Sequence, residues 1–233
     1  MYKRNNNRVI KLALITLCLI ITVTFMPLLT NTGNAYAASG TKKMTVYSKM
    51  VKKGNIVCVN LGNVLAAVNV KTNKAKILYN DSPYSVFNPS NMKIKGNYLY
   101  FQEYGDHETY LIRINIKTGK KKTLHSNVRS YAISGKKIYY KAYKIHWEGN
   151  GDITYHKRVM KLNGKSKKKT SVKVKNIKKK SNAKGYKIVK ANKKIKVIDY
   201  GDGDQEREVY YNYYLQKPNG RKIFIINKGD ELY

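Results

Sequence analysis

The residue types that most often carry out catalysis or hold metals are few and poorly spaced in this chain. None of its four histidines has a second histidine or a cysteine at the spacing of a metal site. They are His107, His125, His146 and His156. The sequence also lacks a Gly-x-Ser-x-Gly elbow and a phosphate-binding glycine loop. We therefore expect a protein that is not an enzyme and that uses no cofactor.

Acidic residues are concentrated in three short segments. Residues 103–108, 148–152 and 199–208 hold ten of the 13 Asp and Glu residues. In the last segment, Asp202, Asp204 and Glu206 alternate like the start of a calcium-binding loop. The motif is incomplete, because Arg207 stands where the sharp-turn glycine belongs. Solvated carboxylates that pair with nearby lysines are the alternative to a calcium site.

Lysine dominates the charge of the chain. The sequence has 47 Lys and Arg against 13 Asp and Glu, a net charge of +34. Such a surface attracts polyanions, and salt screens the attraction. The run at 165–184 is the richest in lysine and supplies the polyanion-binding candidates Lys167, Lys168, Lys169, Lys178, Lys179 and Lys180. The alternative is that lysine only keeps sheet edges soluble and unpaired.

The N-terminus has the pattern of a secretory signal peptide at 1–37. Four cations precede an apolar run at 12–29, and Ala35-Tyr36-Ala37 places small residues where a signal peptidase cleaves. A retained membrane anchor is the alternative, since the run approaches the ~20 residues that span a bilayer. Cleavage would leave 43 cations against 13 acids, a net charge of +30, and no stable membrane span. We expect a secreted protein whose short segment 38–50 precedes a domain at 51–233.

A motif recurs along this domain about every 40 to 57 residues. The segment 96–101 (GNYLYF) is echoed at 135–140 (GKKIYY), and fainter copies lie at 54–59 and 192–197, spaced by 42, 39 and 57 residues. Each copy begins at a turn residue and continues in Tyr, Ile, Val and Leu, which favour strands. A second strand pair follows each copy, and no stretch shows a sustained helical period. The pattern predicts an all-β domain.

Three or four antiparallel strands per repeat at this spacing are typical of β-propeller blades. The fold class we expect is a small, about four-bladed β-propeller, or an open propeller-like arc of antiparallel four-stranded units, after an N-terminal signal helix. Cys58 aligns with Tyr100 and Tyr139 in the repeat, so we expect a buried, inert thiol on a strand.

The repeat residues resemble a known family. The motif Gly-Asn-x-Leu-Tyr-Phe, a polar hairpin, and then Tyr-Leu-Ile-Arg-Ile-Asn-x-Lys-Thr-Gly-Lys are similar to exported bacterial propeller domains of unknown function, related in pattern to the propeller of low-density-lipoprotein-receptor-related proteins. The similarity is specific over 94–140, and the lysine-rich insertion at 165–184 departs from it. It implies a propeller fold with a binding role and brings no catalytic residues.

Tyrosine is the remaining anomaly, because 19 of its 21 residues follow the signal segment and many of them recur within the expected strands. Packing between blades is one explanation, and an aromatic and cationic binding face is the other. Tyr104, His107 and Trp147, in or near the acidic segments, are candidates for a ligand-binding face.

We expect a secreted, non-catalytic binding module that associates with an anionic cell-wall or surface polymer. The alternative is a structural or sensory ectodomain that binds another protein. Export makes nucleic acid an unsuitable partner.

Overall fold

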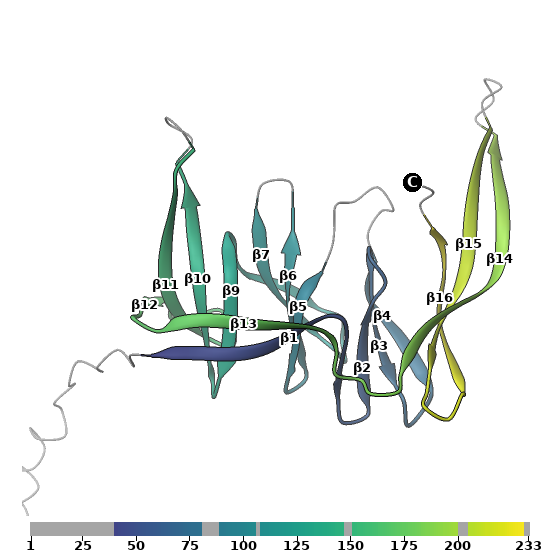
Figure 1. Cartoon of the computed structure of the whole chain (residues 1–233), viewed down its shortest axis with the longest axis horizontal. Helices are drawn as coiled ribbons and strands as arrows, with labels where there is room; N and C mark the ends of the chain where they lie inside the picture. The colour runs from purple at the N-terminus through teal and green to yellow at the C-terminus, as the bar shows by residue number, and fades with distance from the viewer. Residues whose placement is uncertain (1–39, 81–88, 106–107, 147–150, 200–204, 231–233) are drawn as a thin grey trace, which may run out of the picture. The chain divides into compact units, whose positions relative to one another are not determined.

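The computed structural model describes residues 40–80, 89–105, 108–146, 151–199 and 205–230. The signal segment expected at 1–37 lies outside these ranges, and the chain from Gly40 onward forms one compact unit. Within the described ranges the chain forms strands and turns without a helix (Figure 1). No helix there could cross a membrane. The expected all-β class is confirmed.

The strands form three sheets, of nine, four and three strands, and the nine-stranded sheet contains two antiparallel units that meet where Tyr47 of one pairs with Met92 of the other. We call the resulting four antiparallel units blades 1 to 4. Blade 1 consists of β1 (Thr41–Lys53), β2 (Ile56–Asn60), β3 (Val64–Asn69) and β4 (Lys74–Asn80). Blade 2 consists of β5 (Ser90–Lys95), β6 (Tyr98–Tyr104), β7 (Thr109–Asn115) and β8 (Lys121–His125). Blade 3 consists of β9 (Val128–Ser134), β10 (Lys137–Ile145), β11 (Ile153–Lys161) and β12 (Lys168–Lys169). Blade 4 has three strands, β14 (Lys187–Asp199), β15 (Gln205–Gln216) and β16 (Lys222–Asp230).

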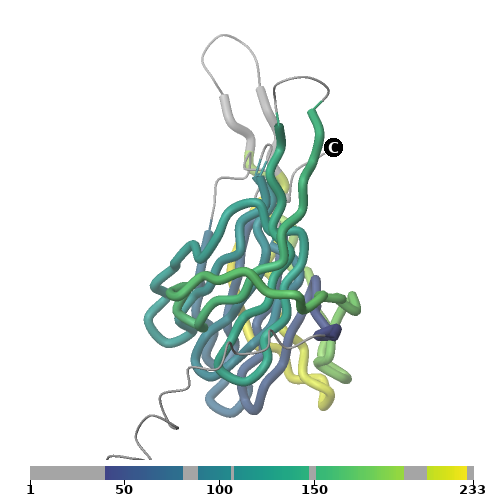
Figure 2. Tube along the Cα trace, turned by 90° about the vertical axis from the view of Figure 1, so that its left-hand side faces the viewer, coloured from purple at the N-terminus to yellow at the C-terminus, as the bar shows by residue number. Residues whose placement is uncertain are grey.

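The blades stand in the order 3, 2, 1, 4 (Figure 1). One apolar cluster joins blades 1 and 2, a second joins blades 2 and 3, and a third joins blades 1 and 4. No cluster of the described residues joins blade 3 to blade 4. The four repeats therefore form an open propeller-like arc, and Figure 2 views it from the end that blade 3 forms.

A glycine at positive φ precedes β2, β6, β10 and β14, one strand of each blade. These turns contain Gly54, Gly96, Gly135 and Gly185, with φ of 56°, 59°, 56° and 74°. A left-handed backbone conformation at a tight turn is tolerated by glycine without steric cost. The fourth copy of the motif thus begins at Gly185, and the last spacing is 50 residues.

The predicted fourth copy at 192–197 was out of register by seven residues. Ile188 pairs with Leu215 as Ile138 pairs with Met160, so Ile188 occupies the repeat position that we had given to Ile195. Ile195 lies farther along β14 and is 60% exposed, whereas Ile138 is fully buried. The segment is on the expected strand but outside the core.

The lysine-rich run at 165–184 is a structural part of the fold. It supplies β12 and β13 (Lys173–Ser181), and β13 pairs in parallel with β1. The segment expected at 38–50 contributes to the same pairing from Thr41 onward, and its Met44 and Val46 are buried. We call the paired segments Thr41–Tyr47 and Lys173–Lys179 the basic ribbon. It crosses the blades from blade 3 toward blade 1 (Figure 1).

A buried hydrogen-bond network joins blades 2 and 3. The Tyr131 hydroxyl lies 2.6 Å from the Asn91 carbonyl oxygen and 3.0 Å from that of Tyr100. Asn91 Nδ2 donates to Gln102 Oε1, and Gln102 Nε2 donates to the Val128 carbonyl. Burial raises the pKa of Tyr131 well above its ordinary value, so the hydroxyl stays protonated and can donate.

We expect Tyr131→Phe to lower the free energy of unfolding by about 1–3 kcal/mol, because buried carbonyl oxygens lose their donor. Chemical denaturation measures the change. Tyr139→Phe is the matched control, since the Tyr139 ring is only half-buried. An equal loss in both variants would contradict the assigned role of the network.

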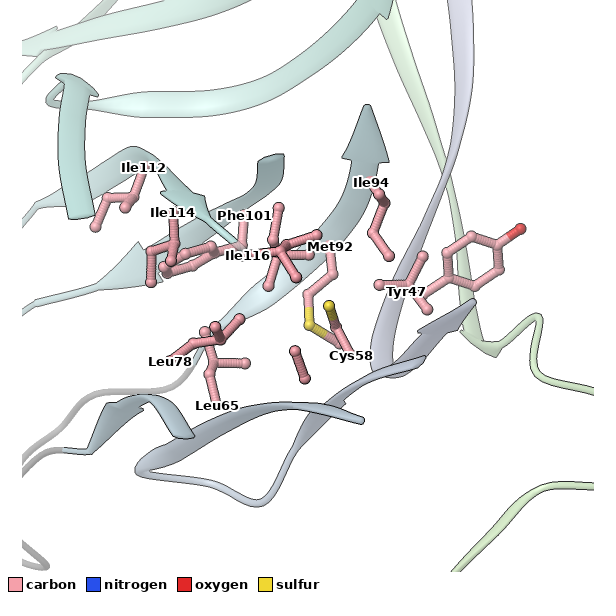
Figure 3. Packing of buried hydrophobic residues seen from close by; sticks show 13 residues of the cluster. Tyr47, Cys58, Leu65, Leu78, Met92, Ile94, Phe101, Ile112, Ile114 and Ile116 are labelled. Atoms are coloured by element: carbon pink, nitrogen blue, oxygen red, sulfur yellow. The ribbon is translucent and has the colours of Figure 1, made fainter. Parts of the chain in front are cut away.

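Cys58 is expected to be unreactive in the folded protein. It lies fully buried between blades 1 and 2 (Figure 3), and burial raises its thiol pKa to about 12. At pH 8 the thiolate that reacts with alkylating reagents is therefore scarce. Mass spectrometry of the peptide that contains Cys58 should show alkylation only after unfolding. Rapid labelling under native conditions would contradict this placement.

Candidate functional site

The six lysines proposed from the sequence are all exposed, and they lie on two neighbouring elements. Lys167 immediately precedes β12, which consists of Lys168 and Lys169. Lys178, Lys179 and Lys180 lie on β13. Five of these lysines therefore lie on strands, and Lys167 adjoins one.

The basic ribbon adds lysines that the sequence pattern did not single out. Its two strands, β1 and β13, contain five lysines each and no acidic residue. Lys43 lies opposite Lys175, and Thr41 lies opposite Lys173. These four residues are exposed and share one face, because side chains alternate along a strand. Lys179, opposite Tyr47, extends the same row.

Apolar contacts and side-chain amides hold the ribbon against the blades. On its inner face, Met44 and Val46 belong to the cluster between blades 2 and 3, and Val174 packs against that cluster. Asn176 Nδ2 donates to the Tyr131 carbonyl at 2.6 Å, and the Tyr131 amide donates back to Asn176 Oδ1 at 3.3 Å. The amide pair fixes β13 to the backbone of β9.

A second pair of this kind fixes the far end of β13. The Lys52 amide donates to Asn182 Oδ1 at 2.6 Å, and Asn182 Nδ2 donates to the Lys52 carbonyl at 3.1 Å. The first amide pair therefore ties the middle of the ribbon to blade 3, and the second ties the chain just beyond β13 to blade 1. The outer-face residues Thr41, Lys43, Lys173, Lys175 and Lys179 are exposed.

The chain segments that form the ribbon carry only positive charge. Both of its strands lie in stretches without Asp or Glu, residues 38–80 and 153–198, and the second stretch alone has 18 Lys and Arg. Like charges directly opposite on paired strands are destabilising. An anion that lies along the outer face would relieve this repulsion, so the ribbon is chemically suited to a polyanion.

Tyrosines fall into two groups. Tyr100, Tyr131 and Tyr140 are buried between blades, as the packing explanation predicts. Tyr155 is 48% exposed on β11, and Lys141 Nζ lies 3.7 Å from its ring centroid. Tyr139 is half-buried, and Lys42 Nζ of the ribbon lies 6.0 Å from its ring centroid. The arrangement of aromatic rings beside lysine is thus present on blade 3.

The acidic segments occupy equivalent places in the fold. They come at the ends of β6, β10 and β14, the strands that carry the repeated motif. These three strands end at the same side of the arc in Figure 1. Glu103 forms an ion pair with Lys121 at 3.0 Å, as the alternative of lysine pairing predicts. Most of the other carboxylates lie outside the described side chains.

The remaining candidates are only partly described. Tyr104 is 41% exposed at the end of β6, whereas His107 and Trp147 lie outside the described residues. Asp202 and Asp204 also lie outside them, and the Glu206 side chain is not described. Among the side chains that are described, no group of three or more His, Cys, Asp and Glu residues could hold a metal ion.

The surroundings of His125 are those of a residue packed within the fold. Burial lowers its pKa, and the ring lies 4.9 Å from the Tyr140 ring between centroids. A base for catalysis would need a reactive partner and a substrate cavity nearby, and the contacts of His125 with a tyrosine ring and a backbone carbonyl offer neither.

No protein-family model matches this chain, and no curated protein sequence matches it.

Solved structures that resemble the chain include propeller proteins. The β-propeller domain of the trilobed protease from Pyrococcus furiosus, described as having an open velcro topology, matches at 12% identity over 78% of this chain and 57% of its own, with a TM-score of 0.35. The N-terminal domain of Nup159 matches at 13% identity over 76% and 50%, with a TM-score of 0.38. The tricorn protease matches at 16% identity over 70% and 15%, with a TM-score of 0.42.

This chain spans 15% to 57% of the length of these three chains. At this level of identity the likeness concerns the fold alone. The arc of four antiparallel units rests on the strand pairing and the apolar clusters of the chain itself.

Proposed function

We propose that this protein is an exported, non-catalytic module that binds an anionic polymer of the cell wall or cell surface. The signal-peptide pattern at 1–37 and the similarity of the repeats to exported bacterial propeller domains support export. An exported protein meets anionic wall polymers and the outer face of the membrane, and it does not ordinarily meet nucleic acid.

The observation that carries the proposal is the acid-free outer face of the basic ribbon. Exposed lysines line this face, with about 6.6 Å between alternate residues of a strand. They are Lys43 on β1 and Lys173, Lys175 and Lys179 on β13, and the exposed Ile177 lies between the last two. Because apolar contacts and two asparagine amide pairs hold the ribbon on the blades, a polymer that binds it does not have to order a flexible segment of backbone. The ordering cost of binding falls on the side chains alone.

Binding should depend steeply on salt, because a polyanion releases condensed counterions when lysines neutralise its charges. If about six charges are engaged, affinity for poly(glycerol phosphate) should fall on the order of a hundredfold or more between 50 and 200 mM salt. Fluorescence anisotropy with a labelled polymer measures this. Binding that is unchanged by salt would favour the alternative, a protein-binding ectodomain.

A triple variant of the ribbon, Lys173→Gln, Lys175→Gln and Lys179→Gln, should lower both the affinity and the slope of its salt dependence, by about one unit of slope per lysine. The control replaces three exposed lysines of blades 1 and 2, Lys71, Lys74 and Lys95, with Gln. It removes the same charge and leaves the ribbon intact. Equal losses in both variants would show that net charge, and not the ribbon, governs binding.

A further inference from the structure

The outer face of blade 3 is exposed although its counterparts in the other repeats are covered. Cys58, Tyr100 and Tyr139 occupy the same repeat position in blades 1, 2 and 3. Cys58 is fully buried between blades 1 and 2, and Tyr100 is buried between blades 2 and 3. Tyr139 is half-buried, because blade 4 packs on blade 1 and no blade follows blade 3 (Figure 2).

The side chains of this face combine flat apolar groups with cations. The strand register places Tyr143 opposite Tyr155, Ile145 opposite Ile153 and Lys141 opposite Lys157, on the same side as Tyr139. Ile153 and Tyr155 are each 48% exposed. Exposed aromatic and aliphatic groups gathered on one face mark a site of interaction.

The positive charge of this face indicates which kind of ligand could bind there. Strands β9 to β12 contain no acidic residue, and Lys141 and Lys42 lie over the Tyr155 and Tyr139 rings. A second copy of the chain would bring its own excess of +34 against these lysines. A purely apolar partner would desolvate the lysines without pairing them, which is costly. The best match carries negative charge and flat apolar surface in the same repeating unit.

We propose that the outer face of blade 3 binds a linear glycan whose sugar rings carry carboxylates. The C–H face of a sugar ring can pack on the exposed part of Tyr155, while Lys141 and Lys157 pair with the carboxylates. A chain of this kind can continue from blade 3 onto the basic ribbon, because Lys42 of the ribbon already reaches Tyr139. This inference rests on the proposed function and narrows it to polymers that contain rings.

The test compares two polyanions of matched charge number, polygalacturonate and inorganic polyphosphate, because only the first has sugar rings. Tyr155→Ala should weaken polygalacturonate binding by roughly tenfold at fixed salt, the loss expected for one aromatic contact. Polyphosphate binding should change by less than about twofold, since the charge is unaltered. Tyr155→Phe should bind polygalacturonate like the unmodified protein, because it keeps the ring.

Phe224→Ala is the matched control. Phe224 is 51% exposed on β16 of blade 4, so the control removes an equally exposed aromatic ring from another part of the chain. It should leave the binding of both polymers unchanged. Ile153→Ala provides a second probe of the face if Tyr155→Ala does not fold, as judged by thermal melting, and it should also weaken polygalacturonate selectively.

The outcomes separate this inference from the proposed function. If Tyr155→Ala weakens neither polymer, or both equally, while the ribbon variant weakens both, the glycan site is wrong and polyanion binding stands. If neither polymer binds, the proposed function fails. If light scattering shows a dimer of the purified protein that Tyr155→Ala dissociates, the face is an interface between copies of this chain, and the glycan site is overturned.

Discussion

The parallel pairing of β1 with β13 determines how the rest of the domain is arranged. In chain order, β13 precedes the Gly185 turn as β1, β5 and β9 precede the turns at Gly54, Gly96 and Gly135. It therefore stands where the first strand of blade 4 belongs. Because β13 pairs with β1, β14 pairs within its own sheet only with β15, and blade 4 has three strands. Parallel strands need a long connection between them, and here blades 1 to 3 form that connection.

The pairing of β13 with β1 also bears on the order of the blades. Leu99 and Ile138, at one repeat position, pack toward the preceding blade. Ile188 occupies this position in blade 4 but packs with Val57 and Val59 of blade 1. Two lysines reinforce the contact, since Lys217 Nζ donates to the Val70 carbonyl at 2.9 Å and Lys228 Nζ to Asn63 Oδ1 at 2.7 Å. The face that would otherwise cover blade 3 is therefore already occupied.

The fold class was predictable from the sequence because each of the first three repeats combines a glycine turn with a strand of buried apolar residues. The fourth was misplaced because Lys193-Lys194-Ile195 matches Lys136-Lys137-Ile138 more closely than the true copy does. Gly185 was the available signal.

The pairing of Thr41 with Lys173 could not be predicted, since the two residues are far apart in sequence and β13 has few apolar residues. The exposure of the lysines was predictable because charged groups stay hydrated, whereas the outer face of blade 3 depends on where blade 4 packs.

The ribbon is a balance between apolar packing on one face and charge repulsion on the other. Burying Met44 and Val46 contributes about 1.5–3 kcal/mol each, and the two asparagine amide pairs add hydrogen bonds to blades 3 and 1. Lys43 lies directly opposite Lys175, and the repulsion between them acts against this pairing. Selection for stability alone would favour acidic or neutral residues at several of these exposed positions, since surface substitutions cost little. A ligand that binds the folded ribbon and not the unfolded chain stabilises the fold by mass action. The positive charge of the ribbon therefore opposes the pairing of β1 with β13 in the isolated protein, and an anionic ligand on its outer face would relieve that repulsion.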